Sequence, residues 1–492
     1  MRLPPLAQVC RLATVLAGYV GSKHVSKKIV IVGGGPGGYE AALVASKYGA
    51  DITLVEDEGA GGSAIRKDVV PSKSFIAGAN IKTDLRRADA MGLNHTLGNA
   101  QLALTALNNR VVALASEQSR DIHNQLERAG VRIVKGRARF SSEQDGHTTH
   151  RVVAELANGE EERLDCDMVL VCTGASPRVL KGAEPDGERI LNWRQMYNLI
   201  EMPTHLIVVG SGVTGAEFVS AYAELGVEVT MVASRDRILP HDDADAADVL
   251  ETVLEGLGVH LEKDARVESV ENTGDGVVVR TTDGREIRGS HVMMSIGSIP
   301  NTQDLNLEAA GVETTPSGHI HVDRVSRTNV AGIYAAGDCT DLMPLASVAA
   351  QQGRIAVDHA LGEGVAPIRL KTVGNAVFTR PEIAAVGVTE QQIRDGEIEA
   401  DIYKLPLSTN PRAKMRSLQH GFVKIFARKG TGEVIGGVIV APTASELIHS
   451  ITIAVTNKLT VRQLSDSMAV YPSLSGSITE AARRLIAHSD LD

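Results

Sequence analysis

Short runs of aliphatic and β-branched residues alternate along the chain with glycine turns and helical patterns. The run Lys28–Val32 is typical of a fully buried strand, and a glycine-rich turn, a helical stretch over 39–48 and a second strand over 51–56 follow it. The same order returns over residues 206–232. A strand, a helix and a second strand in this order form one βαβ unit. The pattern therefore predicts an α/β protein with two Rossmann-like units.

The segments around these units show other patterns. Residues 73–129 carry long apolar-periodic stretches that predict a pair of helices, and strand patterns follow at 131–140, 151–164, 168–172 and 332–336. From about residue 371 the sequence pattern changes to one that is typical of antiparallel strands mixed with helices. This change predicts a separate C-terminal α+β domain.

Length, charge and cysteine content narrow the function. The 492 residues are enough for about three domains. Asp and Glu number 60 against 50 Lys and Arg, and the net charge of −10 argues against a nucleic-acid partner. No run approaches the roughly 18 apolar residues of a membrane-spanning helix, so no integral membrane segment is expected. The four cysteines lack zinc-ligand spacing, so we expect no metal site and a cytoplasmic location.

Residues 1–27 are basic, contain no acidic residue and include a short apolar run over 12–20. This segment has some features of a signal or transit sequence. We favour a dispensable N-terminal extension, because a nucleotide-binding strand begins immediately after it.

The first glycine-rich turn has the spacing of a dinucleotide-binding motif. Gly33, Gly35 and Gly38 lie between a buried strand and a helix. Gly33 permits the sharp turn, Gly35 lets a pyrophosphate approach the backbone, and Gly38 lets helix and strand pack closely. Glu56 ends the next strand, where its carboxylate can accept hydrogen bonds from both ribose hydroxyls of an adenosine.

The second glycine-rich turn carries Gly210, Gly212 and Gly215 in the same register. The position of the acidic residue holds alanine, and Ser234 and Arg235 follow it. Without a carboxylate to repel it, a ribose 2′-phosphate can be held by the serine and an arginine, which favours NADP(H) over NAD(H). The alternative is that the arginines of this loop are solvated surface charges.

With these motifs, the sequence resembles the pyridine nucleotide-disulfide oxidoreductases, which include lipoamide dehydrogenase and glutathione reductase. Further support comes from Thr173 and Gly174, from Gly297 within 295–301, and from Gly337 and Asp338, where the carboxylate binds the flavin ribityl chain in the family. The resemblance implies FAD, NADP(H) or NAD(H), and a homodimer. It divides the chain into an extension (1–27), an FAD-binding domain (28–176), an NAD(P)-binding domain (177–299), a central domain that completes the FAD site (300–370) and a dimerisation domain (371–492).

The catalytic sulfur chemistry of that family is missing. Where disulfide-containing members carry two cysteines, this chain has Ala64 and Val69, and Tyr471 stands where they carry a histidine. Alanine and valine can neither attack nor accept electrons. Lys73 and Glu217 match the family's lysine near flavin N5 and its glutamate partner, so the resemblance implies that the hydride half of the reaction is intact.

This combination is similar to the disulfide-lacking, lipoamide-dehydrogenase-like NAD(P)H quinone reductases of actinobacteria. It implies hydride transfer from NAD(P)H to FAD and then electron transfer directly to a quinone. A soluble NAD(P) transhydrogenase and a non-catalytic FAD-binding subunit of a dehydrogenase complex are the alternatives. Tyr471 would reach the partner subunit's acceptor ring or serve only in packing between subunits.

Overall fold

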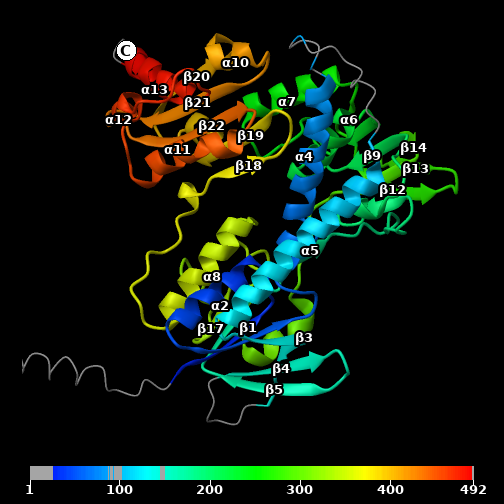
Figure 1. Cartoon of the computed structure of the whole chain (residues 1–492), viewed down its shortest axis with the longest axis vertical. Coiled ribbons are helices and arrows are strands. Elements are labelled where there is room, and N and C mark those ends of the chain that lie inside the picture. The colour runs from blue at the N-terminus through cyan, green and yellow to red at the C-terminus, as the bar shows by residue number, and fades with distance from the viewer. Residues whose placement is uncertain (1–25, 87, 89–91, 93–101, 144–149, 490–492) are drawn as a thin grey trace, which may run out of the picture.

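The protein is described by a computed structural model that covers residues 26–86, 88, 92, 102–143 and 150–489. These residues form three bodies, each built around a β-sheet (Figure 1). Almost all of the predicted extension at 1–27 lies outside the described residues.

The first body contains a seven-stranded sheet in the order β17-β6-β1-β2-β3-β4-β5. Its central strands are parallel, as their buried apolar runs predict, and β4 and β5 add an antiparallel edge. The strands are β1 (Lys28–Val32), β2 (Asp51–Glu56), β3 (Arg132–Phe140), β4 (His150–Leu156), β5 (Glu161–Cys166), β6 (Met168–Val171) and β17 (Ile333–Ala335). Because β17 pairs with β6, the chain returns to this body after it has built the second one.

Helices α2 (Pro36–Lys47) and α8 (Ala346–Ala360) lie side by side on this sheet (Figure 1). Helix α2 begins earlier than its predicted start, at Pro36, because the glycine turn leads directly into the helix. The two helices approach closely at Gly353, where a Cβ atom would lie 2.0 Å from the Gly37 oxygen. Glycine is therefore required at this crossing.

The second body contains a parallel five-stranded sheet in the order β11-β10-β9-β15-β8 and a three-stranded antiparallel sheet, β12-β13-β14. The first of these sheets carries the second βαβ unit, as predicted. Its elements are β8 (Ile190–Asn192), β9 (His205–Val209), α6 (Val213–Glu224), β10 (Glu228–Val232), α7 (Ala244–Gly256), β11 (His260–Glu262), β12 (Val267–Asn272), β13 (Val277–Thr281), β14 (Glu286–Gly289) and β15 (His291–Met294). The strands β7 (Ala175–Pro177) and β16 (Ser298–Pro300) pair where the chain enters and leaves it.

The third body is an antiparallel sheet in the order β18-β19-β22-β21-β20. This sheet confirms the predicted change to antiparallel strands near residue 371. Its strands are β18 (Asn375–Val377), β19 (Glu382–Gly387), β20 (Ala400–Pro406), β21 (Phe422–Arg428) and β22 (Val434–Ala441). Its helices are α9 (Glu390–Arg394), α10 (Pro411–Met415), α11 (Ala444–Thr456), α12 (Val461–Asp466) and α13 (Gly476–Ser489). Short 3₁₀ turns lie at 196–198, 303–305, 307–310, 370–372 and 407–409.

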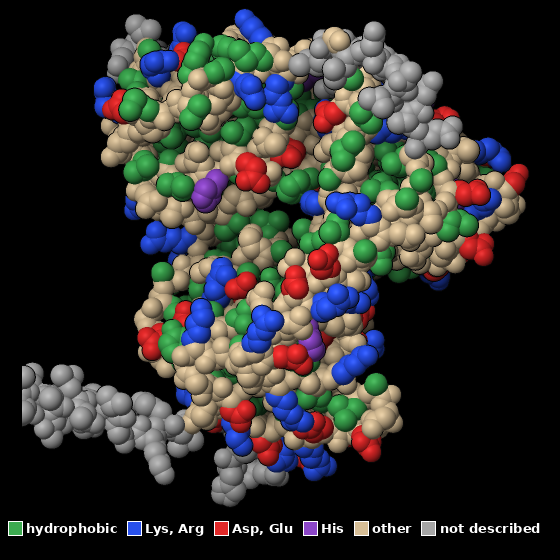
Figure 2. Space-filling view, viewed as in Figure 1, with side chains coloured by type: hydrophobic (Ala, Val, Ile, Leu, Met, Phe, Trp, Pro, Cys, Tyr) green, Lys and Arg blue, Asp and Glu red, His purple; other side chains and the backbone are tan. Residues whose placement is uncertain are grey.

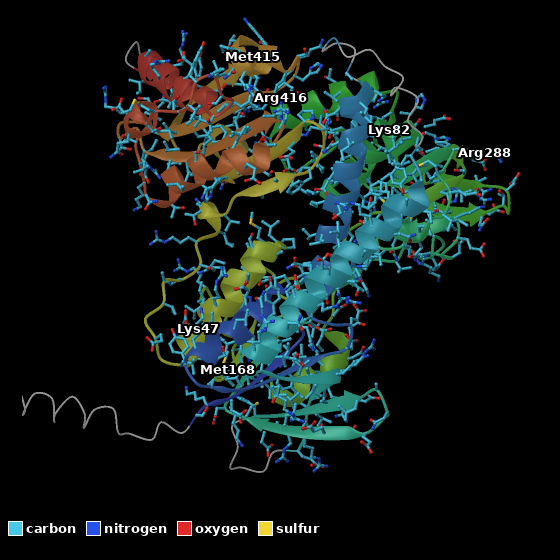
Figure 3. The ribbon with its side chains drawn as sticks, viewed as in Figure 1. Lys47, Lys82, Met168, Arg288, Met415 and Arg416 are labelled. Carbon is cyan, nitrogen blue, oxygen red and sulfur yellow. The ribbon has the colours of Figure 1, made fainter. Side chains whose placement is uncertain are left out.

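The predicted helix pair at 73–129 connects the bodies. Helix α4 (Val69–Arg86) follows the short α3 (Gly62–Arg66), and α5 (Leu104–Arg128) runs beside α4 (Figure 1). The α4 side chain of Phe75 packs against Phe218 and Tyr222 of α6. Lys82, labelled in Figure 3, donates from α4 to the Leu225 oxygen at 2.6 Å. These contacts fix the first and second bodies against each other. Among the described residues, no helix is long and apolar enough to cross a membrane.

Candidate functional site

A cavity of about 1910 Å³ lies where the three bodies meet. Its lining combines the first glycine turn, the α3–α4 region, the start of α6, the segment that follows β17, and residues of β18 and α11. Figure 2 shows a hollow in the middle of the molecular face, between the first body and the other two. This volume is ample for an extended dinucleotide and a second ring-shaped ligand.

The first glycine turn forms a cradle at one end of the cavity. Gly33 has φ of 101°, and a Cβ atom there would lie 2.4 Å from the Cys172 oxygen. At Gly38 a Cβ atom would lie 2.0 Å from the Gly33 oxygen, so only glycine allows helix and strand to pack. A Cβ atom at Gly35, by contrast, would meet nothing closer than 4.0 Å. The backbone at the N-terminus of α2 is therefore open to an anionic group, which fits a pyrophosphate.

Two carboxylates of the cavity lining fit the rest of such a ligand. Glu56 lies at the end of β2 and accepts hydrogen bonds from the backbone N–H groups of Gly34 and, at 2.8 Å, Glu58. Burial raises the pKa of Glu56, although these donors partly offset the effect. Asp338 follows β17, and burial together with the nearby Asp68 raises its pKa. Thr173, Gly174 and Gly337 also line the cavity, as expected for cofactor-binding residues.

The predicted pair of Lys73 and Glu217 forms within this cavity. Lys73 Nζ lies 3.0 and 2.8 Å from the two carboxylate oxygens of Glu217. Phe378 donates its backbone N–H to Glu217 Oε1 at 2.9 Å, and its ring lies 4.8 Å from Lys73 Nζ. Because only 3% of the Glu217 side chain is exposed, the ammonium group is held by a buried counter-ion. The ion pair joins α4 to α6 and thus the first body to the second.

The two positions that carry sulfur in disulfide-containing relatives line the same cavity. Ala64 lies on α3, and Val69 begins α4. The cysteines of the described chain, at 166, 172 and 339, are free and buried. Burial raises the pKa of the Cys339 thiol to about 11 and that of Cys172 well above its ordinary value, so both stay protonated and unreactive at neutral pH. Neither thiol is suited to replace the missing pair.

The second glycine turn repeats the geometry of the first one. Gly210 has φ of 111° and donates to the Val232 oxygen at 3.0 Å, while a Cβ atom at Gly215 would lie 2.0 Å from the Gly210 oxygen. A Cβ atom at Gly212 would meet nothing within 4 Å. The N-terminus of α6 is therefore a second open cradle for a diphosphate.

Eight of the predicted site residues do not line the cavity. Four of them, Gly38, Gly210, Gly212 and Gly215, belong to the two glycine turns, and the other four lie elsewhere. Ser234 and Arg235 are exposed and follow β10, Gly297 lies just before β16, and Tyr471 is 81% exposed. Ser234 and Arg235 follow β10. This strand pairs with β9, and β9 leads into the Gly210 turn. The structure thus brings most of the predicted residues together and leaves Tyr471 on the surface of the single chain.

Several cavity residues carry no local signal in the sequence. Asp68 binds Trp193 and Arg194 across the cavity wall, and His241 and His449 contribute imidazoles from two other segments. The sequence contains many aspartates and histidines, and nothing local marks Asp68, His241 or His449. They stand out only because distant segments fold onto one cavity.

Two family models match the chain in succession. The model for pyridine nucleotide-disulphide oxidoreductases matches residues 27–353, and the model for the dimerisation domain of that family matches residues 373–482. The chain belongs to this family. Its members are flavoprotein oxidoreductases that use FAD and NAD(P)H, which confirms the predicted fold class, enzyme class and cofactors.

Individual relatives agree with this assignment. A Mycobacterium tuberculosis protein named NAD(P)H dehydrogenase (quinone) is 57% identical over 468 residues, which cover 94% of this chain and 95% of that protein. A dihydrolipoyl dehydrogenase of Bacillus subtilis is 32% identical over 92% of this chain and 97% of its own length. The crystal structure of LpdA from Mycobacterium tuberculosis, at 56% identity, covers 93% of this chain and 99% of that chain with a TM-score of 0.89.

Proposed function

We propose that the chain is an FAD-dependent NAD(P)H:quinone oxidoreductase that works without a redox disulfide. The observation that carries the proposal is a contrast within one cavity: the Lys73–Glu217 ion pair is complete, whereas Ala64 and Val69 stand where disulfide-containing relatives carry sulfur. Reducing equivalents then have no sulfur relay and leave for a diffusible acceptor. The name of the Mycobacterium tuberculosis relative supports a quinone as that acceptor.

The first body would hold FAD, and the second would hold the pyridine nucleotide. FAD, when bound, supplies hydride acceptance and electron transfer to the acceptor. The turn at Gly33 and Gly35 would bind its pyrophosphate, Glu56 its adenosine ribose, and Asp338 its ribityl chain. In the second body, Ser234 and Arg235 would bind a 2′-phosphate, which favours NADP(H) over NAD(H).

Lys73 and Glu217 would act on the hydride step. The family resemblance places this lysine near flavin N5, and the buried Glu217 carboxylate fixes the ammonium group in one position. A fixed positive charge stabilises negative charge as it develops, because its orientation needs no reorganisation during the reaction. Ala64 and Val69 would offer apolar surface to a flat quinone ring.

We further propose a cytoplasmic homodimer, in which Tyr471 reaches the acceptor site of the second subunit. The match to a dimerisation domain supports two subunits, and Met468, Val470 and Tyr471 form an exposed apolar segment before α13 that a partner would cover. Tyr471→Ala and Tyr471→Phe should raise the quinone KM if the ring contacts the acceptor. Unchanged kinetic constants in both variants would leave the tyrosine a packing role alone.

An anaerobic titration tests the main proposal. NADPH or NADH should bleach the yellow protein, and a benzoquinone or naphthoquinone should restore the colour within turnover time. Reduction of thio-NAD by NADPH at rates above those with quinones would favour a transhydrogenase instead. A flavin that neither nucleotide bleaches would favour a non-catalytic subunit, and turnover with dihydrolipoamide would contradict the loss of thiol chemistry.

A further inference from the structure

The segment between Ala64 and Val69 poses a structural problem. Disulfide-containing relatives join these two positions by a covalent bond, and here that bond is impossible. The segment consists of the end of the five-residue helix α3 and a turn. Gly61 and Gly62, with φ of 97° and 57°, stand at the start of that helix. A short helix of this kind contributes little stability of its own, so the position of the cavity wall depends on contacts made elsewhere.

The side chain of Asp68 supplies such contacts from the turn between α3 and α4. Its Oδ1 atom accepts hydrogen bonds from Trp193 Nε1 at 2.7 Å and from Arg194 Nε at 3.1 Å, and its Oδ2 atom accepts one from Arg194 Nη2 at 3.0 Å. The guanidinium and the carboxylate thus meet in a two-pronged, charge-assisted arrangement. Arg194 Nη2 also donates to the Ala175 oxygen of β7 at 2.9 Å.

This network is shielded and lies at the cavity. The side chains of Arg194 and Asp68 are 17% and 26% exposed, which makes the pair stronger than a surface ion pair. Asp68, Trp193 and Arg194 all line the cavity, next to Val69. The pKa of Asp338, which burial raises first of all, is raised further by Asp68 and lowered by Arg194, so the pair also lies near this proposed flavin ligand.

We propose that Asp68, Trp193 and Arg194 form a positioning clamp that holds the 64–69 segment against the second body and thereby sets the affinity of the acceptor site. This inference rests on the proposed function. The clamp replaces the missing disulfide as the structural link that holds this segment. It differs from a disulfide in its response to electron transfer. Transfer of electrons through the cavity does not break an ion pair, so the apolar wall keeps its shape in both redox states of the enzyme.

The chain contains a single tryptophan, so Trp193 reports directly on the clamp. In Asp68→Asn the carboxylate charge is lost while the side chain keeps its size. We expect the quinone KM to rise about tenfold, equivalent to about 1.4 kcal/mol. The kcat and the anaerobic rate of flavin reduction by NADPH should change less than about twofold, because Lys73 and Glu217 are untouched. Trp193 fluorescence should shift, because the indole N–H then faces a neutral amide in place of a carboxylate.

Asp165→Asn is the matched control. Asp165 forms a similar two-pronged pair with Arg151, at 2.6 Å from Nε and 3.3 Å from Nη2, on β4 and β5 and outside the cavity lining. This variant should leave the quinone KM and the fluorescence unchanged. A general loss of stability would affect both variants alike, whereas a clamp affects only the first.

An unchanged quinone KM in Asp68→Asn, or an equal rise in Asp165→Asn, overturns the proposal. If Asp68→Asn does not retain FAD, Arg194→Lys serves instead. This substitution keeps the positive charge but removes the paired hydrogen bonds of the guanidinium to Asp68. The same rise in the quinone KM is expected. If the wild-type enzyme reduces no quinone, the proposed function fails. The clamp is then judged by fluorescence, and an unshifted Trp193 emission in Asp68→Asn refutes it independently.

Discussion

Lys424 joins the second and third bodies through an unusually shielded set of charges. Its side chain on β21 is 1% exposed, and its Nζ atom contacts Asp243 at 2.8 Å, Asp245 at 2.6 Å and Glu390. Asp243 also caps α7, since it accepts a hydrogen bond from the Ala246 N–H at 3.2 Å. We predict that Lys424→Met strongly destabilises the protein, because it leaves three carboxylates without this counter-ion.

The size of this loss follows from the two ways in which the variant can respond: the three carboxylates stay charged and repel one another, or one of them takes up a proton. The carboxylate oxygens lie within 4.8 Å of one another, and each unfavourable pair at that separation costs about 3.5 kcal/mol at an effective dielectric constant of about 20. Protonation of one carboxyl group at pH 7 costs about 4 kcal/mol, because its ordinary pKa is about 4. Three carboxylates make three such pairs, which together would cost about 10 kcal/mol, so protonation is the less costly response. We therefore predict a loss of about 4 kcal/mol, within the range for removal of one partner of a buried pair.

The effect of pH has opposite signs in the two proteins. In the wild type, burial alone would raise the pKa of Asp245 and Glu390. Hydrogen bonds from Lys424, together with Lys404 at Asp245 and Arg394 at Glu390, outweigh this effect and lower the pKa of each. A lowered carboxyl pKa gives stability above the unfolded-state pKa, which is lost only as the pH falls through the folded-state pKa. In Lys424→Met the pKa rises instead, so protonation relieves the repulsion and the defect shrinks to about 1.4 kcal/mol at pH 5.

Chemical unfolding of both proteins at pH 7 and pH 5 measures these free energies. EDTA should be present, because three clustered carboxylates offer ligands to a divalent cation. Lys404→Met is the control, since Lys404 also contacts Asp245, at 2.9 Å, but is 48% exposed; it should cost less than about 1 kcal/mol. A loss below about 1 kcal/mol for Lys424→Met at pH 7, or a defect that does not shrink at pH 5, would refute the reasoning.

Three further predictions concern the nucleotide sites. Gly35→Ala should fold normally, because φ of −67° suits alanine, but it should weaken FAD binding about tenfold by filling the cradle. Gly38→Ala would place its Cβ atom 2.0 Å from the Gly33 oxygen, so this variant should lose about 3 kcal/mol of stability. Equal behaviour of the two variants in flavin titration and unfolding would contradict this. Glu217→Gln should slow anaerobic flavin reduction about tenfold in stopped-flow absorbance, because Lys73 loses its counter-ion; an unchanged rate would remove the pair from the hydride step. Arg235→Ala should raise the KM for NADPH about tenfold and leave that for NADH unchanged, and a parallel rise for both would show that no 2′-phosphate contact is made.

Features within one short window of the chain were predictable from the sequence. The glycine at position 38 reflects a backbone contact with Gly33, which lies in the same turn, and the run Lys28–Val32 is a strand with the predicted bounds. The loss of sulfur at Ala64 and Val69 is likewise a property of single positions, which the family resemblance made interpretable. Hydrophobic periodicity also predicted the helix pair that became α4 and α5, since a helix of that length shows its buried face in its own sequence.

Contacts between distant segments were decided by the tertiary structure alone. Asp68 meets Arg194 because β7, β8 and the α3–α4 turn converge on one cavity, and Lys424 meets Asp243 because the third body packs on α7. No periodicity links such residues, since their pairing depends on how whole sheets and helices dock. Local sterics and burial thus determine the two Rossmann-like units from the sequence. The charged contacts of Asp68 and Lys424 form only once docking brings remote side chains within hydrogen-bond distance.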